Sequence, residues 1–209
     1  FALATAVLVP RTIQRLARAA PNLTCILQEA SPNVLLNGLR QGELDFVVGR
    51  IPAGEAEIVS EMLYDQPVCV VAGRSHPLAK RRRVTWAMAA RADWILPPHG
   101  GAARVAFEAT LARVGQRLPH AHVETISLIA IEALVEQGRL ALMPFDVAKR
   151  LADREQIEIL PLKLEVALPP IGVAWEAARR ITPVMDTFLD ALRAEAANLV
   201  SGNKMRRNR

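Results

Sequence analysis

Arg50 is the side chain best placed in this sequence to bind a charged ligand. It closes the stretch Glu43–Arg50, whose polar start leads into a β-branched, apolar core that predicts a buried strand. In open α/β sheets, ligands bind beyond the carboxyl ends of strands. A guanidinium at such an end can grip a carboxylate through two parallel hydrogen bonds. We therefore expect Arg50 to bind an anion, and the alternative is a salt bridge between two lobes of the protein.

The sequence offers little for catalysis or metal binding. It has no Gly-x-Ser-x-Gly elbow, no Walker-type phosphate loop and no dinucleotide-binding glycine motif, and its acidic residues are scattered. His120 and His122 would share one face of a strand, but a metal needs three or four ligands, and no Cys or carboxylate pattern nearby supplies the others. We expect a protein that is not an enzyme and that needs no cofactor or metal.

Composition indicates an α/β protein of two subdomains. Of the 209 residues, 51% are hydrophobic and only 4% aromatic, so Ala, Val, Leu and Ile must build the core. The length exceeds one average domain of about 100–150 residues. No apolar run approaches the roughly 18 residues of a membrane span, and no signal peptide opens the chain, so we expect a cytoplasmic protein. The chain begins at Phe1 without a Met, which suggests that an N-terminal part of a longer protein is absent.

Two basic clusters account for the net charge of +5: Lys80–Arg83 and the tail Lys204–Arg209. Neither alternates with aromatic residues or follows a helix face, so we interpret them as a solvated loop and a disordered tail over 201–209 rather than a nucleic-acid surface. Cys25 and Cys69 lie in strand-like contexts and are expected to be buried, reduced thiols.

Hydrophobic periodicity predicts alternating strands and helices. A first helix after Pro10 should bury Ile13, Leu16, Ala17 and Ala20. The alternation over Leu23–Gln28 predicts a strand, which with the following helix and Arg50's strand would form a parallel βαβ unit. The same logic predicts a second unit, whose elements are a strand at 94–96, a helix from 102, a strand at 122–126, a helix from Ser127 to Gly138 and a strand at 140–143. Thr182-Pro183 should start a last helix.

Three motifs resemble one protein family. Leu35–Phe46 contains Gly42-Glu43-Leu44-Asp45 and resembles the "L…L..GELD" signature of the effector-binding domain of LysR-type transcriptional regulators. His76–Ala79 resembles the family's "HPLA" sequence, and Glu124–Pro144 resembles "E..SL.ALLALV..G.GIALLP", with a departure at Arg139. The order and spacing of these motifs carry the resemblance over residues 3–196.

The resemblance implies a fold and an assembly. The fold is α/β, with two Rossmann-like subdomains joined by two crossover strands, as in type 2 periplasmic binding proteins. The expected division is 1–72 plus 165–200 for one subdomain and 73–164 for the other. A small, anionic effector would bind in the cleft between the lobes. A winged helix-turn-helix outside this chain would bind DNA, and the protein would form a homodimer or homotetramer.

By position, the resemblance also implies three effector-binding loops, in which backbone N–H groups at helix starts can hold an anion. Thr125 and Ser127 could add hydroxyl groups from the second lobe. Ser31 and Ser127 can equally be plain helix caps, and the glycine-containing loop can be a plain connection. The residues of the three loops are Ala4 and Thr5; Ser31 and Asn33; and Pro98, His99, Gly100, Gly101 and Ala102.

A periplasmic solute-binding protein of a transporter is the alternative, because it would share the fold and bind a ligand without regulating transcription. The residues that precede Phe1 in a full-length chain would distinguish the two, since one would carry a helix-turn-helix and the other a secretory leader. The sequence leaves open the identity of the effector, the target genes and whether the regulator activates or represses.

Overall fold

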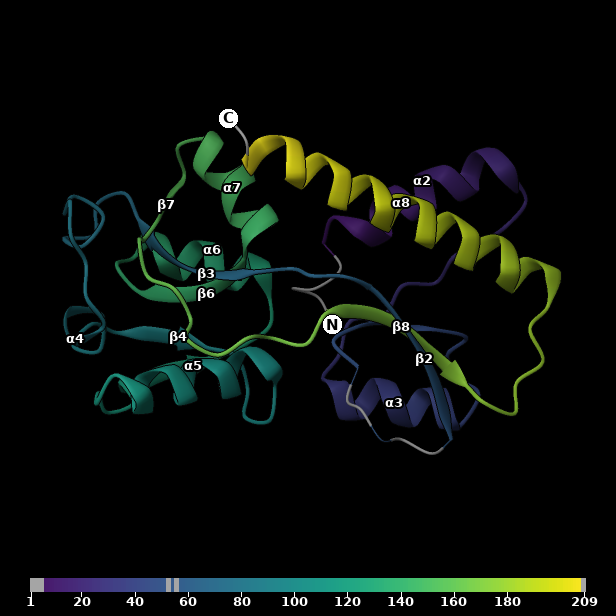
Figure 1. Ribbon diagram of the computed structural model, residues 1–209, viewed down its shortest axis with the longest axis horizontal. Helices are drawn as coiled ribbons and strands as arrows, with labels where there is room; N and C mark the ends of the chain where they lie inside the picture. Colours follow the sequence, from purple (N-terminus) through teal and green to yellow (C-terminus); the bar gives the residue numbers. More distant parts are fainter. Residues whose placement is uncertain (1–5, 52–53, 55–56, 208–209) are drawn as a thin grey trace. The chain divides into compact units, whose positions relative to one another are not determined.

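The computed structural model describes residues 6–51, 54 and 57–207 and divides into two compact units (Figure 1). Unit 1 comprises Phe1–Asp65 and Pro169–Arg209, and unit 2 comprises Gln66–Leu168. The sequence placed the boundaries after 72 and before 165. In the structure, the stretches 66–72 and 165–168 lie in unit 2, and the first contains most of strand β3 (Val68–Gly73), which pairs within the sheet of that unit.

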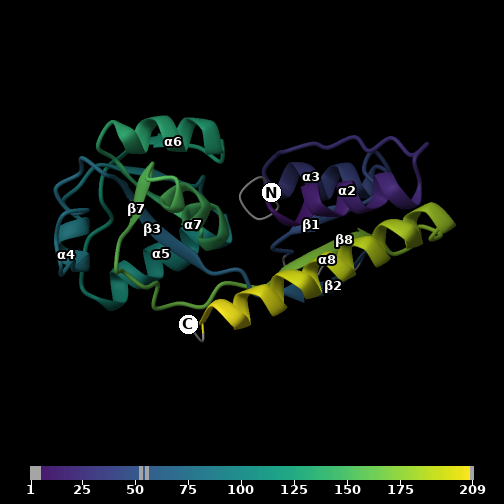
Figure 2. The ribbon, with the colours of Figure 1, turned by 90° about the horizontal axis from the view of Figure 1, so that it is seen from above.

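Unit 1 is a three-layer arrangement around an antiparallel sheet with strand order β1-β8-β2. Ile171 and Val173 of β8 pack with residues of α2 and α8 on one face, whereas Ala174 packs with Leu35 and Leu39 of α3 on the other (Figures 1 and 2). The elements are α2 (Leu8–Ala19), α3 (Pro32–Arg40), β1 (Val47–Gly49), β2 (Ile58–Tyr64), β8 (Ile171–Glu176) and α8 (Pro183–Arg207).

Unit 2 is a five-stranded mixed sheet with helices on both faces (Figure 1). Strands β5, β4 and β6 are parallel, and β3 runs antiparallel to β6 and β7. Phe107 and Leu111 of α5 pack with Trp94 on one face of the sheet. The elements are β3 (Val68–Gly73), α4 (Trp86–Ala89), β4 (Trp94–Leu96), α5 (Ala102–Arg113), β5 (Ala121–Glu124), α6 (Leu128–Glu136), β6 (Leu140–Pro144), α7 (Phe145–Asp153) and β7 (Ile157–Ile159).

The second predicted α/β unit is confirmed as the run β4-α5-β5-α6-β6. Ser127 caps α6 by accepting a hydrogen bond from the N–H of Ala130 at 3.4 Å. Gly138 follows the helix with φ +93°, a left-handed conformation that glycine adopts without steric cost. The cap at Ser127 and the glycine at 138 could be predicted because each fixes the end of a helix through residues that are adjacent in the sequence.

The first predicted parallel unit is wrong. Residues 23–28 form no strand, and β1, the strand before Arg50, pairs antiparallel with β8. Ile26 is 85% exposed and Leu27 is 57% exposed, so neither face of this segment is buried in the chain. Alternation predicts an extended conformation, but a strand also needs a partner edge, which local sequence does not specify.

The first helix is confirmed with a different buried face. Leu8, Thr12 and Leu16 are buried against α8, whereas Ile13 is only half-buried and Ala17 is exposed. Thr12 tolerates burial because its hydroxyl donates to the carbonyl oxygen of Leu8 at 3.0 Å. A search for apolar residues alone overlooks such a position.

The basic clusters differ in structure. Residues 80–83 are exposed, as expected of a solvated loop. The backbone of α8 continues through Arg207, so the chain from 201 to 207 is helical rather than a disordered tail. Within the described ranges, no helix combines the length and apolar character that a membrane span requires.

The two thiols should react differently. Cys69 is buried as expected, and burial raises the pKa of its thiol to about 12, whereas Cys25 is exposed, contrary to expectation. The thiolate is the reactive form, and Cys69 forms almost none of it near neutral pH. Iodoacetamide at roughly pH 8 should therefore modify one thiol per native chain and two per denatured chain, counted by intact mass. Rapid modification of both thiols in the native chain would contradict the burial of Cys69.

Candidate functional site

Arg50 lies at the end of β1 beside the two points where the chain leaves and re-enters unit 1. Its Nη1 donates a hydrogen bond to the carbonyl oxygen of Pro169, and Asp65 and Tyr64 are near enough to favour its charged form. Burial lowers the pKa of Arg50 and outweighs these two contributions. A guanidinium stays protonated near neutrality even so, because its ordinary pKa is far higher. Arg50 is thus a partly desolvated cation at a strand end, the property its proposed anion-binding role requires.

The Ser31–Asn33 loop begins α3. Ser31 is the N-cap residue with extended backbone, φ −66° and ψ 155°, but its side chain makes no capping hydrogen bond. Pro32 occupies the first turn and Asn33 is exposed. The helix forms where the sequence predicted, yet Ser31 does not act as a side-chain cap. Ala4 and Thr5, the remaining predicted residues of this unit, lie outside the described residues.

The loop Pro98–Ala102 connects β4 to α5 and exposes its backbone. Gly100 has φ +80°, and a Cβ added there would meet nothing within 4 Å. Gly101 is the N-cap of α5, and the ring of His99 is exposed. The start of a helix of this length has backbone N–H groups without intrahelical partners, and its dipole favours negative charge. The N–H of Gly101 donates to the carbonyl oxygen of Pro98 at 3.4 Å, so the loop makes a turn directly before the helix start.

Thr125 and Ser127 lie beside this loop. The N–H of Thr125 donates to the carbonyl oxygen of Leu96 at 3.0 Å, which joins the end of β5 to the end of β4. Thr125 Oγ1 accepts from the N–H of Ser127 at 3.0 Å. The structure therefore brings these predicted residues of unit 2 to one edge of the sheet, at the carboxyl ends of parallel strands. Ser127 acts as a cap, as its simpler interpretation predicted.

The sequence interpretation missed a buried arginine in the same place. Arg104 is 3% exposed, and its Nη1 donates to the carbonyl oxygen of Pro97 at 3.2 Å and to Glu124 Oε1 at 3.0 Å. Its Nε donates to Glu108, and its Nη2 lies 3.4 Å from His99 Nε2. The i, i+4 spacing of Arg104 and Glu108 on a predicted helix is a visible signal. The contacts to Pro97 and Glu124 depend on the pairing of strands far apart in sequence.

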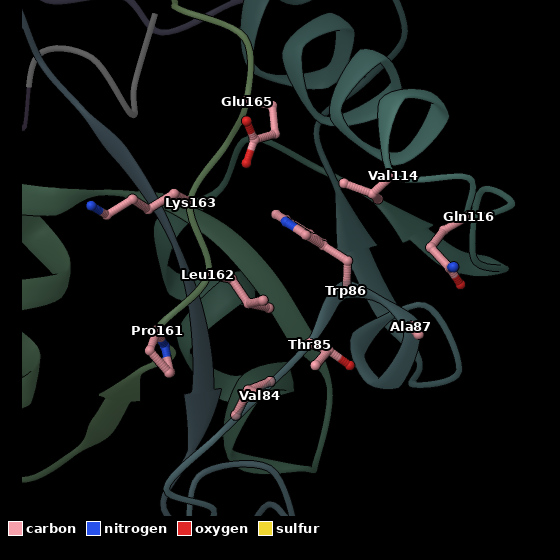
Figure 3. Close-up of a pocket in the computed structure, with 10 residues that line it drawn as sticks. All are labelled: Val84, Thr85, Trp86, Ala87, Val114, Gln116, Pro161, Leu162, Lys163 and Glu165. Carbon is pink, nitrogen blue, oxygen red and sulfur yellow. The ribbon is translucent and has the colours of Figure 1, made fainter.

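Two hollows lie away from the predicted residues. The larger, of about 510 Å³, is in unit 2 between the start of α4, the end of α5 and residues 161–165, with Trp86 at its middle (Figure 3). The smaller, of about 240 Å³, lies on unit 1 between arginines of α2 and Glu195 of α8, which pairs with Arg15 at 3.1 Å. Neither includes Arg50, the 98–102 loop or Thr125.

The two histidines are close, with ring centroids of His120 and His122 4.2 Å apart. Over the part of the chain that the structure describes, no three or more His, Cys, Asp or Glu side chains gather in a way that could hold a metal ion.

Two α/β units, one around a three-stranded and one around a five-stranded sheet, are the fold of type 2 periplasmic-binding-protein-like domains. The family model of the LysR substrate binding domain matches residues 1–197, and the chain belongs to this family. The transcriptional regulator GbpR of Azospirillum brasilense is 29% identical over 208 residues, which is 96% of this chain and 58% of GbpR. The chain thus spans little more than half of that relative.

Solved structures show the same fold. The CcmR regulatory domain of Synechocystis PCC6803, in complex with 2-PG, matches with a TM-score of 0.78 at 20% identity, covering 94% of each chain. The effector-binding domain of QuiR, in complex with shikimate, matches with a TM-score of 0.73 at 19% identity, covering 93% of this chain and 92% of QuiR. At this level of identity, the likeness concerns the fold alone.

Proposed function

We propose that this chain is the sensor of a LysR-type regulator and that it binds a small anionic effector between its two units. The observation that carries the proposal is the open Gly100-Gly101 turn at the start of α5, beside Thr125 at the carboxyl ends of β4 and β5. Arg50 supplies a partly desolvated cation in the other unit. The shikimate bound to QuiR is a carboxylate, which agrees with this class of ligand.

The wider role follows from the family. In the full-length protein, effector binding would alter how the subunits bind DNA through an N-terminal winged helix-turn-helix, and the protein would act in the cytoplasm. A homodimer or homotetramer is the expected assembly, because symmetric association is the usual form of soluble oligomers. The relatives found are named as transcriptional regulators, which favours this role over solute binding for a transporter.

A thermal-shift screen tests the proposal. The panel contains organic acids, aromatic carboxylates, sulfonates, amino acids, sugars and inorganic anions. A ligand at 100 times its Kd adds about 2.7 kcal/mol to the free energy of unfolding, which raises Tm by several degrees. Arg50→Ala should weaken an anionic hit by more than about 1 kcal/mol, or roughly fivefold in Kd, because a charge-assisted bond is lost.

The control is Arg180→Ala, which removes an exposed arginine of the same unit. Each shift is measured from the variant's own ligand-free Tm, because Arg50→Ala also loses the bond to Pro169. A hit whose Kd is the same in Arg50→Ala and Arg180→Ala would remove Arg50 from the site. A panel in which only neutral ligands raise Tm would refute the anionic effector.

A further inference from the structure

We infer that Arg104 is a positioning residue of the effector site. Its side chain holds the start of the 98–102 loop and the end of β5 in the arrangement that binds the ligand. That these two segments form an effector site rests on the proposed function. That Arg104 holds the two segments in place rests on its own contacts. Arg104 itself carries no part of the ligand contact that we propose. Its effect passes through the two segments that it joins.

The position of Arg104 is unfavourable for a cation, so its hydrogen-bond partners must offset the free-energy cost of placing a charge there. It lies in the first turn of α5, where the helix dipole disfavours positive charge, and it is 97% removed from solvent. Burying a charge is costly unless it is paired and hydrogen-bonded. Glu108 on α5 and Glu124 on β5 supply two carboxylates, which more than balance the single positive charge of Arg104.

Each contact fixes a different part of the site. The bond to the Pro97 carbonyl holds the first residue after β4, where the loop begins. The bond to Glu124 holds the last residue of β5, directly before Thr125 and the start of α6. Glu108, one turn further along α5, sets the plane of the guanidinium. The side chain of Arg104 thus joins a segment that precedes α5 in the sequence to one that follows it.

His99 extends the same network into the loop. His99 Nε2 lies 3.4 Å from Arg104 Nη2 and 3.4 Å from Glu124 Oε1. His99 Nδ1 lies 3.8 Å from Glu108 Oε1. His99, the residue directly before Gly100, therefore contacts the same cluster, and loss of Arg104 should loosen the turn for which we propose anion binding.

Hydrogen exchange of the ligand-free protein tests the positioning role without any ligand. Arg104→Met should accelerate exchange of the Gly101 and Thr125 amides about tenfold, because their segments lose a shared anchor. Arg113→Met is the matched control on the same helix, since Arg113 is exposed and donates to the carbonyl oxygen of Glu165 at 3.1 Å. It should leave both amides unchanged.

Uniform acceleration throughout unit 2, or unchanged exchange at both amides, would overturn the inference. If Arg104→Met fails to fold, Glu124→Gln replaces it: the amide keeps an acceptor for Arg104 but loses the charge, and the Thr125 amide should still exchange several-fold faster. Unchanged exchange in folded Glu124→Gln would overturn the link to β5.

Sulfate titration followed by the glycine amide resonances separates this inference from the proposed function. Wild-type chain should show saturable shifts at Gly100 and Gly101, and Arg104→Met should bind sulfate about tenfold more weakly, whereas Arg113→Met should match wild type. Absence of sulfate shifts in wild type would count against the anion site and leave the exchange result to decide the role of Arg104. Equal sulfate affinity in folded Arg104→Met and Arg113→Met would overturn the inference.

Discussion

Phe107→Ala should lower the free energy of unfolding of unit 2 by about 3–5 kcal/mol, the usual cost of truncating a buried aromatic side chain. Phe107 is fully buried, and its ring centroid lies 4.6 Å from that of Trp94 and 6.0 Å from that of Trp86. It fixes α5 to the sheet, and α5 begins at the candidate anion-binding loop. The substitution should therefore disturb the 98–102 loop as well as lower the free energy of unfolding.

Urea denaturation followed by tryptophan fluorescence measures this loss, because the rings of Trp86 and Trp94 in unit 2 both pack with the truncated ring. Val105→Ala is the control on the same helix: Val105 is 53% exposed, so its truncation should change the free energy by less than about 0.5 kcal/mol. A loss below about 1 kcal/mol in Phe107→Ala would mean that this core is not packed as described.

Gly73→Ala should cost about 3 kcal/mol or more, at the upper end of overpacking effects, because the new methyl group meets rigid backbone. A Cβ at this position would lie 2.6 Å from the carbonyl oxygen of Val135 and 3.3 Å from Cα of Glu136. Gly73 ends β3, and Val135 lies in α6, so the close approach of this helix to the strand requires glycine. Either the helix moves away from the sheet or the strand shifts its register.

Gly38→Ala is the matched control in unit 1. Its Cβ would meet side chains rather than backbone, with Leu44 at 3.2 Å and Glu43 Oε2 at 3.6 Å, and an Ala within a helix gains up to about 1 kcal/mol over Gly. The change in the free energy of unfolding should therefore stay within about 1 kcal/mol of zero. The same denaturation experiment compares the two variants. Equal stabilities of Gly73→Ala and Gly38→Ala would contradict the contact between β3 and α6.

Local signals explain why much of unit 2 could be predicted. Strand 94–96, Gly100-Gly101, Ser127 and Gly138 each state where an element starts or ends, and the structure places those elements accordingly. The resemblance to LysR-type effector-binding domains, drawn from short motifs in a fixed order, is confirmed by the family match.

Non-local pairing explains what could not be predicted. Residues 23–28 alternate as a strand does, but a ladder needs a partner edge elsewhere in the chain. The exposure of Cys25 follows from the same missing partner. Arg104 was overlooked because its contact with Glu124 arises only when β5 pairs with β4. Buried polar groups such as Thr12 escape any search for apolar periodicity.

Mapping amide shifts of ¹⁵N-labelled protein with the most stabilising anion of the panel tests the central claim most directly. We expect saturable shifts in both units, at Ser31, Asn33 and Arg50 in unit 1 and at 99–102 and 125–127 in unit 2. Shifts confined to one unit, or centred on the hollow around Trp86, would contradict a sensor that binds an anionic effector with residues of both units.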